Sequence, residues 1–144
     1  MKRVFLALDH YVERHRLGEV LFAPFDIKLS LFTVVVPDLV YFTAERFARV
    51  VNEKHATAAP DLVVEVLSPG TRRRDQGRKR VIYEREGVGE YWIVDPVAQE
   101  VTALRRAAPD AGFTPATALA HARREALTSP FFPGLRISLS RIFR

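Results

Sequence analysis

The chain has 144 residues, 48% of them hydrophobic and 27% charged, and a formal net charge of +5 at pH 7, which predicts a single globular domain over 1–144. No apolar run approaches the ~18 residues of a membrane span, and Asp9 and His10 interrupt the first apolar stretch too early for a secretion signal, so we expect a cytoplasmic protein without membrane contact. Because the chain has no cysteine, disulfides and thiolate metal sites are excluded, and a metal would need carboxylate, histidine or carbonyl ligands.

The N-terminal third predicts one helix and two strands. Residues 3–16 carry apolar side chains at helical spacing and Gly18 follows as a stop signal, so one amphipathic helix is expected. Residues 19–29 alternate between apolar and polar side chains, which is the period of a half-buried strand. Residues 33–43 are rich in β-branched and aromatic residues and predict a second strand, in which Pro37 indicates a bulge or an edge position.

The middle of the chain predicts a β-helix-β crossover. After a short connecting helix at 44–53, residues 61–68 are apolar on both faces, which is typical of a central strand covered on both sides. Thr71 can cap a helix that runs to about Glu86, and residues 90–96 form the next strand. Two glycines between that helix and that strand are suited to end the helix.

The C-terminal third has weaker patterns. Residues 101–104 alternate, residues 109–112 are turn-like, and residues 135–143 suggest further strands. The predicted fold class is therefore α/β, with a mixed central β-sheet flanked by helices in the order α-β-β-β-α-β and with extra C-terminal strands.

Two acidic residues, Asp38 and Glu65, lie within apolar strands. An isolated ionised carboxylate is too costly there unless it is paired, hydrogen-bonded or bound to a cation. Asp61 shares a strand face with Glu65 and is expected at the mouth of the strand. For each of these carboxylates, a strand-end position or a salt bridge to an arginine explains the residue as well as a ligand role does.

The predicted second long helix carries Asp75, Lys79 and Tyr83 on one stripe, because they are four residues apart. This stripe would face the polar positions of the preceding strand. An ordinary Asp75–Lys79 ion pair and a core tyrosine with a solvated hydroxyl are the simpler explanation. Gly77 costs ~1 kcal/mol relative to alanine in a helix interior, which suggests the close approach of another strand or of a phosphate backbone.

Two carboxylates on adjacent strands and one lysine suit phosphodiester hydrolysis. Asp38 and Glu65, with the carbonyl of Val66, offer the hard oxygen ligands that Mg²⁺ or Mn²⁺ prefers. Lys79 would orient the attacking water and stabilise the charge of the transition state. Basic residues near the helix start would bind flanking phosphates of nucleic acid independently of sequence: Arg72, Arg73, Arg74 and Arg78.

Several segments taken together are specific to one family: PDLVVEVLSP at 60–69, then Thr71, Asp75, Lys79 and Tyr83, then GVGEYWIVDP at 87–96, with VVVPDLVYF at 34–42 and FFPGLRISLSRIF at 131–143. Through them the chain resembles the Uma-type restriction endonuclease family of the PD-(D/E)XK nuclease superfamily. The resemblance implies a restriction-endonuclease-like core and a Mg²⁺-dependent endonuclease acting on DNA. It matches Asp38 and Glu65 to the metal-binding acids and Lys79 to the catalytic lysine, with Asp75 and Tyr83 supporting.

Two departures from the family pattern qualify the expected activity. The superfamily motif places its lysine two positions after the second acid, where this chain has Leu67, so Lys79 would supply it from the following helix. Family members also carry an additional N-terminal segment with a glutamate that joins the metal site, whereas this chain starts inside the next helix, as though truncated. The alternatives are therefore a catalytically incomplete nuclease fold that binds nucleic acid or a protein, and a structural domain that forms homo-oligomers through exposed apolar surface.

Overall fold

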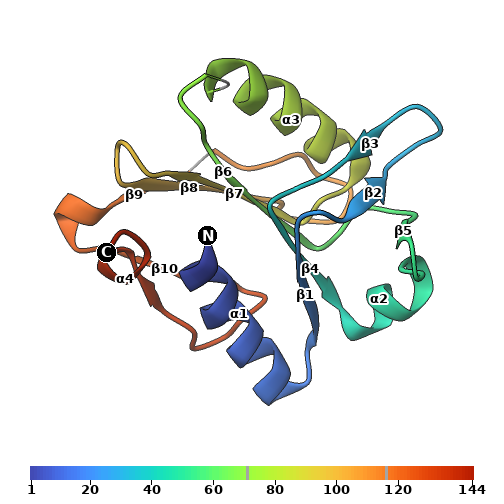
Figure 1. The fold of residues 1–144 in the computed structure, drawn as a ribbon, viewed down its shortest axis with the longest axis horizontal. Coiled ribbons are helices and arrows are strands. Elements are labelled where there is room, and N and C mark those ends of the chain that lie inside the picture. The colour runs from blue at the N-terminus through green and yellow to red at the C-terminus, as the bar shows by residue number, and fades with distance from the viewer. Residues whose placement is uncertain (71, 116) are drawn as a thin grey trace.

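The computed structural model describes residues 1–70, 72–115 and 117–144, and the side chains of residues 72–75 lie outside the described part. Within it, a six-stranded sheet has the strand order β1-β4-β6-β7-β8-β9. Its strands are β1 (Gly18–Phe22), β4 (Leu39–Thr43), β6 (Leu62–Val66), β7 (Glu90–Asp95), β8 (Glu100–Arg105) and β9 (Thr117–Ala120). Helix α1 (Lys2–His15) lies on one side of the sheet and α3 (Arg72–Glu86) on the other (Figure 1).

Smaller elements complete the fold. A three-stranded sheet has the order β3-β2-β5, and β10 pairs with β11 at the C-terminal end. The bounds are β2 (Asp26–Lys28), β3 (Val34–Val35), α2 (Ala44–Val50), β5 (His55–Ala56), the 3₁₀ helix η1 (His121–Arg123), β10 (Ala126–Leu127), β11 (Ile137–Ser138) and α4 (Leu139–Ile142). No helix in the described residues is both long enough and apolar enough to cross a membrane.

The sheet is mixed because one pair of strands is parallel. Strands β6 and β7 run parallel and are joined through α3, whereas the pairs β1/β4, β4/β6, β7/β8 and β8/β9 are antiparallel. The predicted crossover and the interior position of β6 are therefore confirmed. The α/β fold class with a mixed central sheet flanked by helices is confirmed as well.

Two buried clusters cover the two faces of the sheet. The α1 face contains Leu62, Val64 and Trp92, and the α3 face contains Val63, Tyr83 and Tyr91. Neighbouring residues of β6 thus alternate between the two clusters, as the pleat of a strand requires. This alternation decides the direction of Glu65, which comes two residues after Val63 and so lies on the α3 face.

The prediction of one strand over 19–29 is wrong, although its alternation is right. The segment divides at Ala23–Pro24 into β1 of the large sheet and β2 of the small one. The predicted strand over 33–43 divides in the same way into β3 and β4, with Pro37 and Asp38 between them. Because proline cannot donate a ladder hydrogen bond, each proline marks the place where the chain changes sheets.

The C-terminal segment 135–143 is only partly a strand. Residues Ile137–Ser138 form β11, and the chain then turns into the short helix α4. Leu139 is fully buried in the α1-side cluster, and Ile142 packs against the same cluster. Their spacing of three residues is helical, so one side of this turn faces the core.

Gly18 is the glycine whose replacement should cost the most stability. Its φ is +146°, and a Cβ built there would lie 2.0 Å from the carbonyl oxygen of Phe42 on the paired strand β4. We expect Gly18→Ala to lower the free energy of unfolding by about 2–4 kcal/mol, because both the backbone conformation and the overlap oppose a side chain. Urea denaturation of the purified variant measures this change.

Gly77→Ala is the matched control for that measurement. Gly77 lies inside α3, and apart from its chain neighbours and the backbone of its own helix no described atom comes within 4 Å of a Cβ built on it. The expected close approach of another strand is therefore wrong. The variant should raise the free energy of unfolding by about 0.5–1 kcal/mol, since alanine favours the helix. Equal destabilisation by both substitutions would contradict the explanation given for Gly18.

Candidate active site

Glu65 is a buried carboxylate on the α3 face of β6. Its exposed fraction is 6%, and it follows the fully buried Val63 on the same face. Burial raises the pKa of this carboxyl above its ordinary value, because a low-polarity environment disfavours the charged form. Keeping Glu65 ionised therefore requires nearby cations or hydrogen-bond donors.

Helix α3 supplies two donors to Glu65. Lys79 Nζ lies 3.1 Å from Glu65 Oε1 and forms an ion pair with it. The hydroxyl of Tyr83 donates to the same oxygen over 2.7 Å. Because these residues are four apart on one helix, a single stripe of α3 directs both groups at the strand. Both contacts lower the pKa of Glu65 and so offset part of the effect of burial.

Tyr83 is a core residue whose hydroxyl reaches the site. Its side chain is fully buried, and its ring packs edge-on against Tyr91 with the centroids 4.9 Å apart. Burial and the negative charge of Glu65 raise the pKa of its hydroxyl, so this hydroxyl stays protonated and donates. Tyr83 thus holds the Glu65 carboxylate in one orientation.

Asp38 comes next to Glu65 from the neighbouring strand. Leu39 pairs with Val64 in the antiparallel register of β4 and β6, and one further step of that register sets Asp38 opposite Glu65. The carboxylate of Asp38 accepts a hydrogen bond of 2.8 Å from the backbone N–H of Val66. Its charge also contributes to the raised pKa of Glu65, as expected for two nearby carboxylates.

The donor set fits a small divalent cation. Two carboxylates, Asp38 and Glu65, stand at one end of paired strands, and hard oxygen ligands of this kind suit Mg²⁺ or Mn²⁺. No group of three or more histidine, aspartate or glutamate side chains suited to a metal occurs in the part of the chain that the structure describes. Mg²⁺ is usually held by one or two carboxylates together with water, so two acids are sufficient.

The predicted phosphate-binding residues are only partly described. Arg78 is exposed on α3 next to Lys79. The side chains of Arg72, Arg73, Arg74 and Asp75 lie outside the described residues, as does Thr71, the predicted helix cap. Lys79, by contrast, is described, and it pairs with Glu65 on the strand. An ion pair within the helix is therefore not a sufficient explanation for this lysine.

Asp61 has a structural role, as its simpler interpretation predicts. Its carboxylate accepts a hydrogen bond of 2.8 Å from the N–H of Thr43 and lies 3.3 Å from Nε of Arg46. These contacts join the start of β6 to the start of α2. Asp61 is therefore a strand-end residue and is not part of the Glu65 cluster.

Glu90 is a second buried carboxylate that the sequence did not single out. It is 4% exposed, and burial raises its pKa. Trp92 Nε1 and Ser129 Oγ each donate to it over 2.8 Å, and Nε of Arg105 lies 3.4 Å away. The sequence signal for this contact was that Glu90 and Trp92 are two positions apart and therefore share one face of a strand. These contacts fasten the segment around Ser129 to β7 and satisfy the acid with protein groups.

Comparisons with known proteins agree with this architecture. A family model described as "Uma2: Putative restriction endonuclease" matches residues 2–140. A crystal structure of a "putative nuclease belonging to DUF820" from Anabaena variabilis superposes with a TM-score of 0.79 at 18% sequence identity. The match covers 99% of this chain and 76% of the Anabaena chain, and at this identity it shows the shared fold. No curated protein matches the chain.

Proposed function

The chain belongs to the Uma2 family of restriction endonuclease-like proteins, and from that premise we propose that it is a metal-dependent nuclease that hydrolyses phosphodiester bonds in DNA. The observation that carries the proposal is the cluster in which Lys79 Nζ lies 3.1 Å from the buried Glu65 carboxylate. Asp38 stands opposite Glu65 in the strand register. Two acids and one lysine at one point are the groups that this hydrolysis needs.

The energetics of the cluster favour a functional explanation. Breaking a buried ion pair is costly, but such a pair rarely stabilises a fold more than apolar residues of the same size would. Glu90 shows how this fold satisfies a buried acid that has a structural role, with contacts to Trp92, Ser129 and Arg105. At Glu65 the partner is instead a lysine whose side chain is 31% exposed. The Glu65 cluster is thus open to solvent on its lysine side.

Each residue of the cluster has a proposed role. Asp38 and Glu65 would hold Mg²⁺ or Mn²⁺, which when bound supplies an activated water and screens the charge of the phosphate. Lys79 places a positive charge where negative charge develops on the phosphoryl oxygens. Tyr83 keeps Glu65 in place through its hydrogen bond, and the N–H of Val66 does the same for Asp38.

The positive net charge of the chain supports a nucleic acid as its binding partner. The chain has a net charge of +5, and Arg78 is exposed one residue before Lys79. Cations beside the site can bind the phosphates that flank the scissile bond without reading sequence. Binding of this kind weakens steeply as salt rises, because it releases counterions from the DNA.

Asp38→Asn tests the proposed metal site. The amide oxygen of Asn can still accept the hydrogen bond from Val66, so the fold should persist while one ligand charge is lost. We expect the affinity for Mn²⁺, measured by titration calorimetry, to fall at least about tenfold, and plasmid cleavage in Mg²⁺ to fall with it.

Two other outcomes separate the alternatives. If the unmodified protein takes up no Mn²⁺ but binds DNA with steep salt dependence, the chain is a nucleic-acid-binding module on a nuclease fold. If Asp38→Asn binds Mn²⁺ as tightly as the unmodified protein does, Asp38 is not a ligand and the proposed site is wrong.

A further inference from the structure

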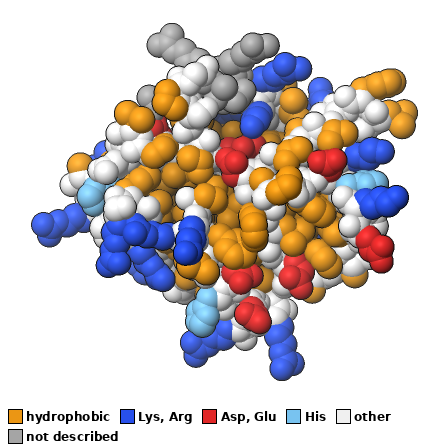
Figure 2. All heavy atoms as spheres, viewed as in Figure 1, with side chains coloured by type: hydrophobic (Ala, Val, Ile, Leu, Met, Phe, Trp, Pro, Cys, Tyr) orange, Lys and Arg blue, Asp and Glu red, His pale blue; other side chains and the backbone are white. Residues whose placement is uncertain are grey.

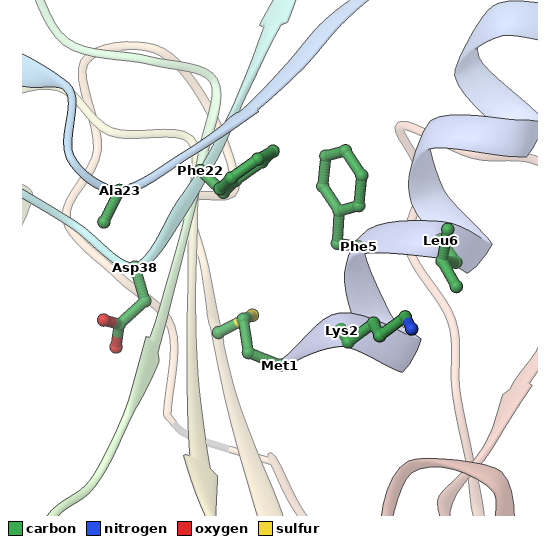
Figure 3. A pocket seen from close by; sticks show the side chains of 7 residues that line it. All are labelled: Met1, Lys2, Phe5, Leu6, Phe22, Ala23 and Asp38. Carbon is green, nitrogen blue, oxygen red and sulfur yellow. The ribbon is translucent and has the colours of Figure 1, made fainter.

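A pocket on the α1 side of the sheet shares Asp38 with the candidate active site, whose buried tyrosine lies on the α3 side. It has a volume of about 480 Å³ and is lined by the first turns of α1, by the end of β1 and by Asp38. Phe5 and Phe22 meet edge-on, with their ring centroids 4.9 Å apart. Figure 3 shows Phe22 and Asp38 on one side of the pocket, with Phe5, Met1 and Lys2 on the other.

The walls of this pocket are mostly apolar, and several of their side chains are exposed. Phe22 is 60% exposed, Leu6 48% and Met1 38%. Figure 2 shows hydrophobic side chains gathered in the middle of the face seen in Figure 1, with acidic side chains at their border and basic ones around the periphery. A contiguous exposed apolar patch rimmed by polar residues is typical of a ligand-binding groove.

The position of Asp38 connects the pocket to the site. Asp38 lines the pocket, while its carboxylate accepts from Val66 on the strand that carries Glu65. A ligand that reaches both places needs an apolar flat face at one end and a phosphate at the other. A nucleotide has this composition, and a volume of a few hundred Å³ is within the usual range for a bound small group.

We propose that this pocket binds an unpaired nucleobase next to the scissile phosphate, stacked on Phe22, so that the substrate is single-stranded DNA or DNA with unpaired nucleotides. The proposal rests on the proposed function for the placement of the phosphate at Asp38. Lys2 at the pocket wall is available to a neighbouring phosphate of the same strand. What favours a nucleotide over a purely apolar ligand is that Asp38, the proposed metal ligand, is part of the pocket wall.

The chemistry of stacking excludes an intact duplex from the pocket. Bases in a duplex are stacked on their neighbours, and reaching an aromatic pocket requires an unpaired or flipped nucleotide. Stacking on an aromatic side chain tolerates any base, because every base has a π-face. The pocket would therefore distinguish unpaired from paired nucleotides, and it would not distinguish one base sequence from another.

A fluorescence experiment with Phe22→Trp tests the proposal without cleavage. Trp92 is 1% exposed, so a change in emission on adding DNA reports on the new indole. In buffer containing EDTA, a short single-stranded oligothymidylate should quench this emission. The same oligonucleotide with abasic sites and the corresponding duplex should leave it unchanged, since neither offers an unpaired base.

Binding measurements on two further variants provide the matched control. Phe22→Ala removes the ring and should weaken binding of the single strand about 5- to 100-fold by fluorescence anisotropy. Phe22→Tyr retains the ring and should stay within about twofold of the unmodified protein. A Phe22→Ala variant that binds as tightly as Phe22→Tyr would overturn the proposal.

The remaining outcomes test the proposed pocket and the proposed function separately. Cleavage of duplex DNA in Mg²⁺ with no quenching by a single strand overturns the pocket and leaves the nuclease. Quenching without any metal-dependent cleavage supports the pocket and removes the nuclease. If sedimentation shows a dimer that Phe22→Ala dissociates, and DNA leaves the indole emission unchanged, the surface binds a second copy and the proposal is wrong.

Discussion

Replacing Glu65 by glutamine is expected to reduce Mg²⁺-dependent DNA cleavage by about 10³-fold or more. The reason is the loss of a charged ligand, since the cation supplies several kcal/mol of transition-state stabilisation. Glutamine retains the shape of the side chain and can still accept a hydrogen bond from Tyr83, which lies 2.7 Å from Glu65 Oε1. Cleavage of supercoiled plasmid over a range of enzyme concentrations measures the loss.

As a control, the stability of this variant is compared with that of the unmodified protein, both free of metal in EDTA. Burial raises the pKa of Glu65, against the lowering effects of Tyr83 and Lys79. A carboxyl with a raised pKa contributes stability below its ordinary pKa and loses that contribution as pH rises through the raised value. Glu65→Gln should therefore unfold no more easily than the unmodified protein at neutral pH, and its stability should fall less with pH above 4.5. Retained cleavage in this folded variant would end the assignment of Glu65.

Replacing Lys79 by methionine is expected to reduce cleavage about 10²- to 10³-fold, the usual loss when one preorganised positive or hydrogen-bonding group is removed. Methionine keeps most of the length of the side chain but has no charge to place near the phosphate. It also leaves the buried Glu65, at 6% exposure, with one donor fewer. Single-turnover kinetics with saturating enzyme separates this effect on chemistry from an effect on binding.

Arg80→Met is the matched control for Lys79→Met. Arg80 is exposed on the same helix one residue further along, so its loss removes the same charge without touching Glu65. We expect its cleavage rate to stay within a few-fold of the unmodified protein, because exposed charges act mainly through a screened field. An equal loss in both variants would mean that Lys79 acts only through net charge, and its proposed role would be wrong.

Much of the region that carries the candidate site could be predicted from local patterns. The apolar run of β6, the helix between its predicted cap and the glycines that follow it, and β7 could be read from local sequence signals, and the structure has them at β6 (Leu62–Val66), α3 (Arg72–Glu86) and β7 (Glu90–Asp95). Glu65 was noticeable as an acid inside an apolar run. Lys79 and Tyr83 were noticeable because i, i+4 spacing sets them on one stripe of a helix.

The remaining features depend on pairing between distant segments. The two predicted N-terminal strands each divide between two sheets, and a propensity pattern does not state which partner a strand will find. The burial of Glu90 also depends on Ser129, 39 residues away in the chain. The proximity of Asp38 to Glu65 follows from the β4–β6 register, which only the folded sheet defines.

The crossover from β6 through α3 bears on how the residues of the proposed site come together during folding. Glu65 contacts partners only 14 and 18 positions ahead of it, whereas Asp38 reaches a partner 28 positions away in another strand. Short loops close at a lower entropic cost and form earlier than long ones. The Asp38 contact closes a loop twice as long as the Lys79 contact does, at an entropic cost about 0.6 kcal/mol higher. The proposed site is therefore complete only when β4 has paired with β6.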